Sequence, residues 1–297
     1  MIELYKDGAR MKVALLGGEL RAYQDAQGRE RLWCGDAAVW KGVSPVLFPA
    51  IGALKDGGAA FEGQRYAVPR HGFARDLPFE VTEQGEDFVT LTLEDNEETR
   101  KVYPYRFGLS VTHRFVPNGF ETRFTVENHS GREMPFLIGG HPGFVCPMEE
   151  GERFEDYVVR FEKPEEGVLA VCGEKGLLYG EGRAPLTPDG RDLPLRHEDF
   201  DRLDTYIFAG LKSRRVDLIN PATGRGVRLS FPEMPVLAIW SPPHKNAPYV
   251  CLEPWHGLPA YAAESGRFED KPYHVKVGVG GAFSCGYRAE FLEGGMA

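Results

Sequence analysis

Two apolar stretches of the chain each end in a side chain that can carry a proton, and a proline follows each time. In the first, residues 249–252 lead to Glu253 and Pro254. In the second, residues 134–140 lead to His141 and another proline. Proline disfavours the helical conformation for the residue before it, so both side chains are expected at the ends of extended strands. A carboxylate and an imidazole in one cleft would form an acid/base pair for proton transfer.

Polar residues in two other stretches could bind a small substrate. His71 precedes a glycine and lies beside Arg70 in Pro-Arg-His-Gly-Phe-Ala-Arg-Asp, although an exposed turn with a local ion pair would have the same sequence. Asp204 comes just before an apolar run, where a plain turn or cap aspartate is the alternative. Asp201 competes with it in the same loop.

Three aromatic side chains near these stretches, Phe144, Trp240 and Trp255, could stack on the C–H face of a sugar. Each could equally belong to the hydrophobic core.

Other chemistries find little support in the pattern. His71, His141 and Glu253 would be an acceptable zinc set, but no His-x-His or His-x-x-x-His spacing supports one, so we expect no metal. The sequence has no Gly-x-Ser-x-Gly motif, no P-loop and no dinucleotide-binding glycine motif. Cys251 lies near Glu253, but the pattern gives it no histidine partner, so no nucleophilic role is expected.

The elements that position these residues should be strands. Residues 107–115 and 120–126 alternate apolar and polar side chains around Pro-Asn-Gly, which predicts a hairpin. Helical periodicity is scarce, and one or two turns are expected at 258–265. Further strands are expected at 11–16, 19–23, 88–94, 215–219, 226–231, 236–240, 249–253, 275–279 and 284–292. The pattern predicts one all-β domain over 1–297 with few short helices, either a large antiparallel β-sandwich or a barrel.

Composition limits the possible partners. The chain has 297 residues and a formal net charge of −9, which disfavours nucleic-acid binding. No apolar run reaches the roughly 20 residues of a membrane span, and the N-terminus does not look like a signal peptide. The five cysteines are widely spaced and odd in number, as expected of reduced thiols in a cytoplasmic protein.

The motifs, taken in order, resemble the aldose 1-epimerase (galactose mutarotase) superfamily, and within it the LacX-like branch. The resemblance covers roughly residues 30 to 260 and implies the family's large antiparallel β-sandwich. The matching segments are Leu-Phe-Pro-Ala-Ile-Gly at 47–52, His-Gly-Phe-Ala-Arg-Asp at 71–76, Ile-Gly-Gly-His-Pro-Gly-Phe at 138–144, Asp-Thr-Tyr-Ile-Phe at 204–208 and Cys-Leu-Glu-Pro-Trp at 251–255.

The resemblance also implies a reaction, the interconversion of the α and β anomers of a free aldohexose without a cofactor. Glu253 matches the family's catalytic base and His141 its acid. His71 matches a histidine that binds the sugar near its ring oxygen, and Asp204 an aspartate that binds hydroxyls.

One position departs from the family. Ala53 stands where members often carry a sugar-binding arginine, and Lys55, Arg70 or Arg75 could replace it. Two alternatives therefore stay open. One is a hexose-6-phosphate 1-epimerase, which needs a basic cluster such as Arg214 with Arg215, or Lys245. The other is a non-catalytic sugar-binding protein. The sequence is compatible with a monomer and with a homodimer.

Overall fold

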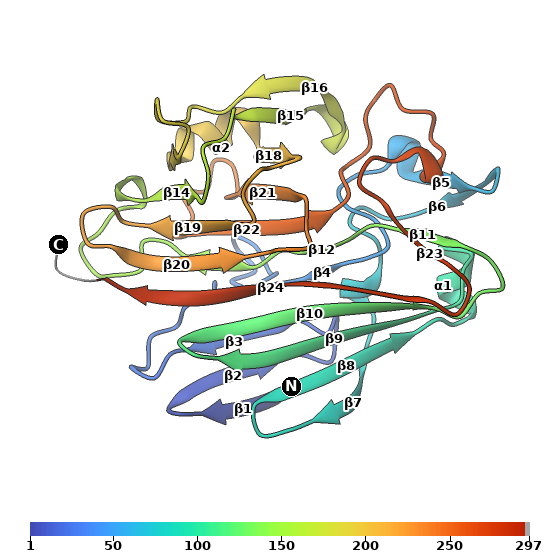
Figure 1. Cartoon of the computed structure of the whole chain (residues 1–297), viewed down its shortest axis with the longest axis horizontal. Coiled ribbons are helices and arrows are strands. Elements are labelled where there is room, and N and C mark those ends of the chain that lie inside the picture. The colour runs from blue at the N-terminus through green and yellow to red at the C-terminus, as the bar shows by residue number, and fades with distance from the viewer. Residues whose placement is uncertain (295–297) are drawn as a thin grey trace.

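Two large antiparallel sheets form the centre of the fold in a computed structural model that describes residues 1–294 (Figure 1). Residues 295–297, the end of the predicted domain 1–297, lie outside the described part. The larger sheet has nine strands, in the order β17 (Asp192–Pro194), β14 (Val158–Phe161), β19 (Arg215–Ile219), β20 (Arg225–Ser230), β24 (Ala282–Glu293), β10 (Gly119–Asn128), β9 (Phe107–Val116), β8 (Phe88–Glu94) and β7 (Glu80–Gln84).

The second sheet has six strands and carries the predicted acid and imidazole segments. Its order is β18 (Thr205–Ala209), β21 (Val236–Trp240), β22 (Tyr249–His256), β12 (Ile138–Gly140) and β4 (Val46–Leu47), with β13 (Gly143–Val145) also paired to β22.

Smaller elements surround these two sheets. A three-stranded sheet contains β1 (Ile2–Lys6), β2 (Ala9–Val13) and β3 (Leu20–Gln24), and three strand pairs are β5 (Gly58–Phe61) with β6 (Gln64–Ala67), β11 (Met134–Phe136) with β23 (Val275–Val277), and β15 (Val168–Cys172) with β16 (Leu178–Arg183). The described α-helices are α1 (Glu97–Val102) and α2 (His197–Leu203). Short 3₁₀ turns lie at Lys55–Gly57, Ala74–Asp76, Phe154–Asp156, Glu174–Gly176 and Phe268–Asp270. Neither described α-helix is long and apolar enough to cross a membrane.

Aromatic pairs join the two large sheets and define the core between them. Phe161 of β14 meets Phe208 of β18 with ring centroids 5.1 Å apart, and Phe48 beside β4 meets Phe107 of β9 at 5.0 Å. Successive side chains of a strand point to opposite faces. One face of the six-stranded sheet therefore packs against the nine-stranded sheet, and its other face is free to line a site.

The fold class predicted from the sequence is confirmed: the protein is an antiparallel β-sandwich with few short helices. The hairpin of β9 and β10 has the expected register, with Phe120 opposite Phe115, and the strands predicted at 88–94, 215–219 and 236–240 match β8, β19 and β21.

The helix expected at 258–265 is wrong, since that segment is an irregular turn, and α1 and α2 lie elsewhere. Both helices are too short for an apolar period, and α1 depends on its cap, where the Asn96 side chain accepts hydrogen bonds from two backbone N–H groups.

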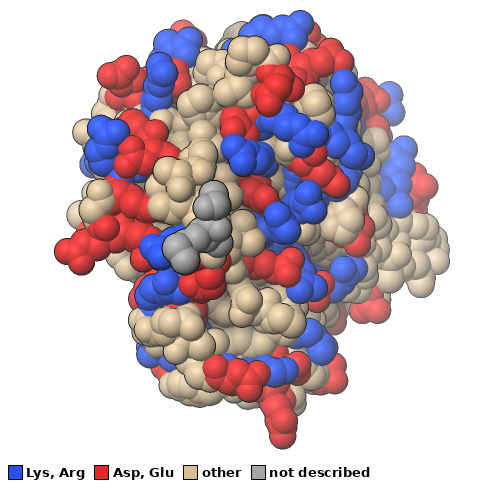
Figure 2. All heavy atoms as spheres, turned by 60° about the vertical axis from the view of Figure 1, so that its left-hand side comes forward, with Lys and Arg blue, Asp and Glu red and all other residues tan. Residues whose placement is uncertain are grey.

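Charged side chains of both signs are interspersed over the face seen in Figure 2. The formal net charge of −9 is therefore not gathered into one acidic field on this face.

Gly72 makes the closest backbone contact beside a predicted site residue, and its replacement by alanine should be costly. Gly72 has φ +71°, and an added Cβ would lie 2.0 Å from the Phe48 carbonyl oxygen. We expect Gly72→Ala to lower the free energy of unfolding by about 2 kcal/mol or more. Urea denaturation measures this, and Gly131→Ala is the control because nothing lies within 4 Å of its added Cβ. Equal stabilities of the two variants would contradict the expectation.

Candidate active site

The strand register places His141 directly opposite Glu253. β12 and β13 pair with β22 on either side of the turn, with Gly139 opposite Trp255 and Gly143 opposite Cys251. Continuing that register brings residue 141 opposite residue 253, and the His141 Nε2 atom lies 3.1 Å from the Glu253 Oε2 atom. The predicted pairing of the two stretches is therefore present in the structure.

The sequence-based placement of Glu253 at a strand end is wrong, because β22 continues to His256. Pro254 lies inside this strand, opposite Leu237 of β21, whereas β22 pairs with β12 only through His256 and Trp255. Glu253 is thus held in mid-strand, which fixes its carboxylate more firmly than a strand end would.

A cavity of about 340 Å³ opens over this pair. Seven of the eight residues predicted for the site line it: Glu253, His141, His71, Asp204, Arg70, Trp240 and Trp255. A volume of this order suits one small ligand.

Phe144 is the exception, and its predicted stacking role is corrected by the structure. It pairs with Val250, whose side chain lies on the core face of the sheet, and it is fully buried. Its ring contacts Phe291 of β24, with centroids 6.4 Å apart. The alternation of β13 therefore directs Phe144 away from the cavity.

His71 is held as a neutral hydrogen-bond donor. The Gly52 backbone N–H donates to the His71 ring nitrogen Nδ1 at 3.1 Å. The backbone N–H of His71 donates in turn to the Gly52 carbonyl oxygen at 2.9 Å. Nδ1 is therefore unprotonated, and the remaining ring proton must reside on Nε2. Burial lowers the pKa of His71 well below its ordinary value, and His141, Arg75 and Arg70 lower it further.

Asp204, not Asp201, is the aspartate that lines the cavity. It follows the last residue of α2 with φ 63°, and the Thr205 hydroxyl donates to its carboxylate. Asp201 instead accepts a hydrogen bond from the His244 N–H outside the cavity. A non-glycine residue in this conformation is uncommon and often marks a functional position.

Arg70 occupies the space beside Ala53. Both side chains lie next to Gly176. A Cβ added to Gly176 would be 3.0 Å from Arg70 Nη1 and 3.5 Å from Ala53 Cβ. Arg70 forms no ion pair with any residue between 1 and 294. Lys55 instead donates to the Glu264 carbonyl oxygen.

The basic residues suggested from the sequence for a phosphate, Arg214 with Arg215, or Lys245, do not line the cavity. Arg70 and Arg75 do.

Burial governs the protonation of the catalytic pair. It raises the pKa of Glu253 well above 4.5, with Arg70 opposing and Asp204 adding to the shift. Burial also lowers the pKa of His141 from 6.5 to about 3. Both shifts disfavour the charged forms, because each group is removed from water. The two shifts therefore favour a carboxylic acid beside a neutral imidazole over an ion pair.

Sequence reasoning missed several residues around the pair. Trp40 lies with its ring centroid 4.9 Å from that of His141, and no local motif marks it. Other missed lining residues are Gly52, Cys172, Gly176, Thr205, Ile207 and Pro259, whereas Arg75, suggested from the sequence as a replacement for the family's arginine, also lines the cavity.

The expectation that Cys251 has no histidine nearby is wrong. Cys251 and Glu253 are two residues apart in β22 and share a face. The potential ligand atoms of His141, Cys251 and Glu253 all lie within 4.8 Å of one another.

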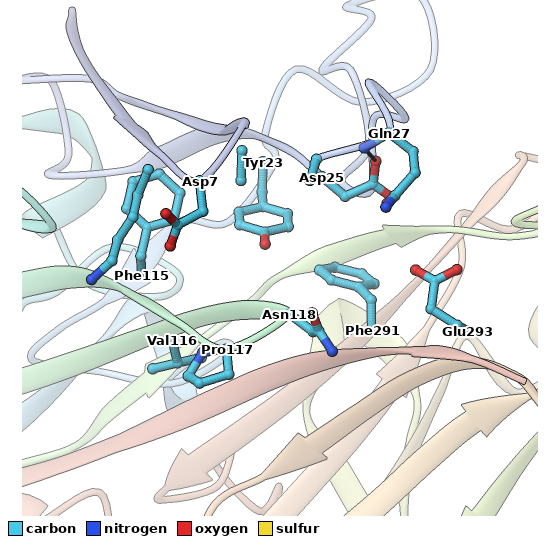
Figure 3. A pocket seen from close by; sticks show the side chains of 13 residues that line it. Asp7, Tyr23, Asp25, Gln27, Phe115, Val116, Pro117, Asn118, Phe291 and Glu293 are labelled. Carbon is cyan, nitrogen blue, oxygen red and sulfur yellow. Dashed lines mark hydrogen bonds between the residues drawn. The ribbon is translucent and has the colours of Figure 1, made fainter.

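A second cavity of about 360 Å³ lies between the N-terminal strands and the β9–β10 hairpin (Figure 3). Two of its acidic side chains are already neutralised, since Asp25 pairs with Arg29 and Arg31 and Glu293 pairs with Arg29. None of the residues predicted for the site lines it. The cavity over Glu253 is therefore the stronger candidate for catalysis, although it is slightly smaller.

Comparison with known proteins gives consistent results. Residues 1–276 match the family model for aldose 1-epimerase. Protein LacX (plasmid form) of Lactococcus lactis subsp. lactis is 35% identical over 283 residues, which are 93% of this chain and 94% of that protein. A protein named "Putative glucose-6-phosphate 1-epimerase" from Escherichia coli K12 is 34% identical, over 90% of this chain and 85% of its own. The crystal structure of a galactose mutarotase-like protein from Lactobacillus casei has 30% identity and a TM-score of 0.91, covering 98% of this chain and 99% of that one.

Proposed function

The chain belongs to the aldose 1-epimerase family, and we propose that it interconverts the α and β anomers of a free aldohexose, with Glu253 as base and His141 as acid. The observation that carries the proposal is the 3.1 Å separation of His141 Nε2 and Glu253 Oε2 under a cavity of sugar-like size. The ring oxygen and the anomeric hydroxyl of a sugar share one carbon, so two proton-transfer groups this close can reach both.

The reaction needs two coupled proton transfers. Glu253 takes the proton from the anomeric hydroxyl while His141 gives one to the ring oxygen, so the bond between C1 and the ring oxygen breaks and C1 becomes an aldehyde. Rotation about C1–C2 presents the other face of the aldehyde. His141 then takes the hydroxyl proton back as the ring closes, and Glu253 returns a proton to O1. No group is consumed, and each transfer contributes about 10²–10⁴-fold.

A pair that shares one proton suits both halves of this cycle. A carboxylate with an imidazolium opens the ring, and a carboxylic acid with a neutral imidazole closes it. These two states contain the same number of protons, so the pair moves between them without exchange with water. Burial favours the uncharged state, which is the one reached after ring opening.

The remaining cavity residues would hold the sugar. His71 presents its Nε2–H as a donor to a ring or hydroxyl oxygen, since Gly52 occupies Nδ1. Asp204 would accept hydrogen bonds from hydroxyls, and Trp240 and Trp255 offer rings for the C–H face of the sugar.

Exchange spectroscopy tests the proposal directly. Saturation-transfer NMR on glucose and on galactose measures the rate at which each anomer converts to the other. We expect at least one sugar to exchange faster than its spontaneous rate in proportion to protein concentration. Saturable binding of both sugars, measured by calorimetry, without faster exchange would instead identify a sugar-binding protein.

A phosphorylated hexose is a second candidate substrate, because Arg70 lines the cavity without an ion pair to any residue of 1–294. The name of the Escherichia coli relative refers to such a sugar. If phosphate binds there, Arg70→Ala should raise the KM for glucose 6-phosphate by about 10–100-fold, as expected for a hydrogen bond to a charged group. The KM for glucose should change little. Arg214→Ala, outside the cavity, is the matched control, and equal effects on both sugars would reject the phosphate site.

The pH–rate profile should lack an inflection near 6.5, the ordinary pKa of histidine. Activity requires one proton on the pair, and on the acid side it falls when a second one binds. Burial lowers the pKa of His141 to about 3, so the acid limb should lie several pH units below neutrality. Exchange rates corrected for spontaneous mutarotation at each pH test this expectation, and an acid limb centred at 6.5 would contradict it.

Acid unfolding must be followed in parallel, because buried histidines destabilise the fold as the pH falls. Burial also lowers the pKa of His113 to about 4. Between pH 6.5 and that value the unfolded chain binds more protons than the folded one, so stability is full above 6.5 and is lost progressively as the pH decreases. Circular dichroism at each pH separates this loss of fold from a loss of activity.

A further inference from the structure

A sulfur, a nitrogen and an oxygen ligand meet below the cavity, in the side chains of Cys251, His141 and Glu253. All three residues are buried, and their ligand atoms lie within 4.8 Å of one another. We propose that they bind a thiophilic divalent cation such as Zn²⁺, and that the bound ion blocks anomer exchange by occupying the acid/base pair. The inhibitory half rests on the proposed function, whereas the metal site does not.

The geometry needs little adjustment. Zinc binds sulfur at about 2.3 Å, and nitrogen and oxygen at about 2.0–2.2 Å, so a tetrahedral site separates its ligand atoms by about 3.4–3.6 Å. His141 Nε2 and Glu253 Oε2 are already 3.1 Å apart. Cys251 comes from the same face of β22 as Glu253, two residues earlier, and His141 from the turn opposite. The ion would be held by two adjacent backbone segments of one sheet.

Charge balance favours the same ion. A thiolate, a carboxylate and a neutral imidazole neutralise a dication, so the loaded site carries no net charge, like the pair without metal. Binding releases two protons, one from the Cys251 thiol and one shared by Glu253 and His141. A buried site tolerates such a neutral set far better than an uncompensated charge. Mg²⁺ prefers six oxygen ligands and should not compete.

The fourth coordination position would face the sugar cavity. Glu253 and His141 line that cavity, so water or a sugar hydroxyl can complete a tetrahedron. Tyr249 lies two residues before Cys251 on the same strand face, and its buried hydroxyl has no hydrogen-bond partner among the residues described. Such a donor could stabilise a metal-bound thiolate.

Cadmium is a suitable probe, because a Cd²⁺–thiolate bond gives an ultraviolet charge-transfer band. The band is measured in the double variant Cys34→Ala/Cys172→Ala, which removes the two cysteines that are not buried. We expect a band that saturates at one Cd²⁺ per chain, is displaced by Zn²⁺ and is unaffected by Mg²⁺. Absence of the band in this folded variant would overturn the site.

Adding Cys251→Ala to the double variant identifies the sulfur. The band should disappear, and the Zn²⁺ affinity, measured by competition with a chromophoric chelator, should fall by at least about 10–100-fold. A band that persists would come from Cys146 or Cys285 and would overturn the proposal.

Activity gives a separate result. One equivalent of Zn²⁺ should abolish anomer exchange in the Cys34→Ala variant, which keeps every residue that lines the cavity, and exchange that continues with the ion bound would overturn the inhibitory half. If no sugar exchanges at all, the proposed function fails, and the Cd²⁺ band alone still decides the metal site.

Discussion

Glu253→Gln should lower the rate of anomer exchange by about 10²–10⁴-fold, because glutamine cannot accept the anomeric proton. The fold should be retained. Burial raises the pKa of Glu253 and so favours its carboxylic-acid form, and an amide of similar shape can keep a hydrogen bond to His141. Saturation-transfer NMR measures the exchange, and thermal unfolding measures the stability of the same sample.

Asp201→Asn is the matched control for this variant. It removes a carboxylate from α2, where Asp201 accepts a hydrogen bond from the His244 backbone N–H and does not line the cavity. Its exchange rate should stay within about twofold of the wild-type rate, as expected for a surface change away from the chemistry. A Glu253→Gln variant as active as this control would rule out Glu253 as the base.

His141→Asn should cause a loss of similar size, because the ring oxygen then receives no proton. The informative experiment combines the two changes. Groups that act as one unit lose most of their effect when either is removed, so the double variant should be about as slow as the slower single variant. Losses that multiply would show two independent roles and would argue against a shared proton.

The sequence predicted the strands well where apolar and polar side chains alternate along the chain, as in β8, β9 and β10. It also selected seven residues that meet in one cavity. Glu253 and His141 were recognised because each follows an apolar run and precedes a proline, and the other five came from turn residues, nearby aromatics and the resemblance to the family. It failed where contacts are set by tertiary packing. Trp40 reaches His141 from a segment with no motif of its own.

Two further failures concern which side of a strand a residue faces. Phe144 belongs to a matching motif, yet pairing with Val250 turns it into the core. Cys251 was judged without a partner, yet the register brings His141 to it. Local sequence alternation gives the relative faces within a strand but does not say which face meets the opposite turn.

The pairing of β12 and β13 with β22 also affects how this protein can change in evolution. His141 faces Glu253 because the register on both sides of the turn is continuous. One inserted or deleted residue in either segment would turn the carboxylate or the imidazole to the other side of the sheet. Length changes should therefore be rare in these two segments among active relatives. They should be common in the β15–β16 hairpin, whose length does not set this register.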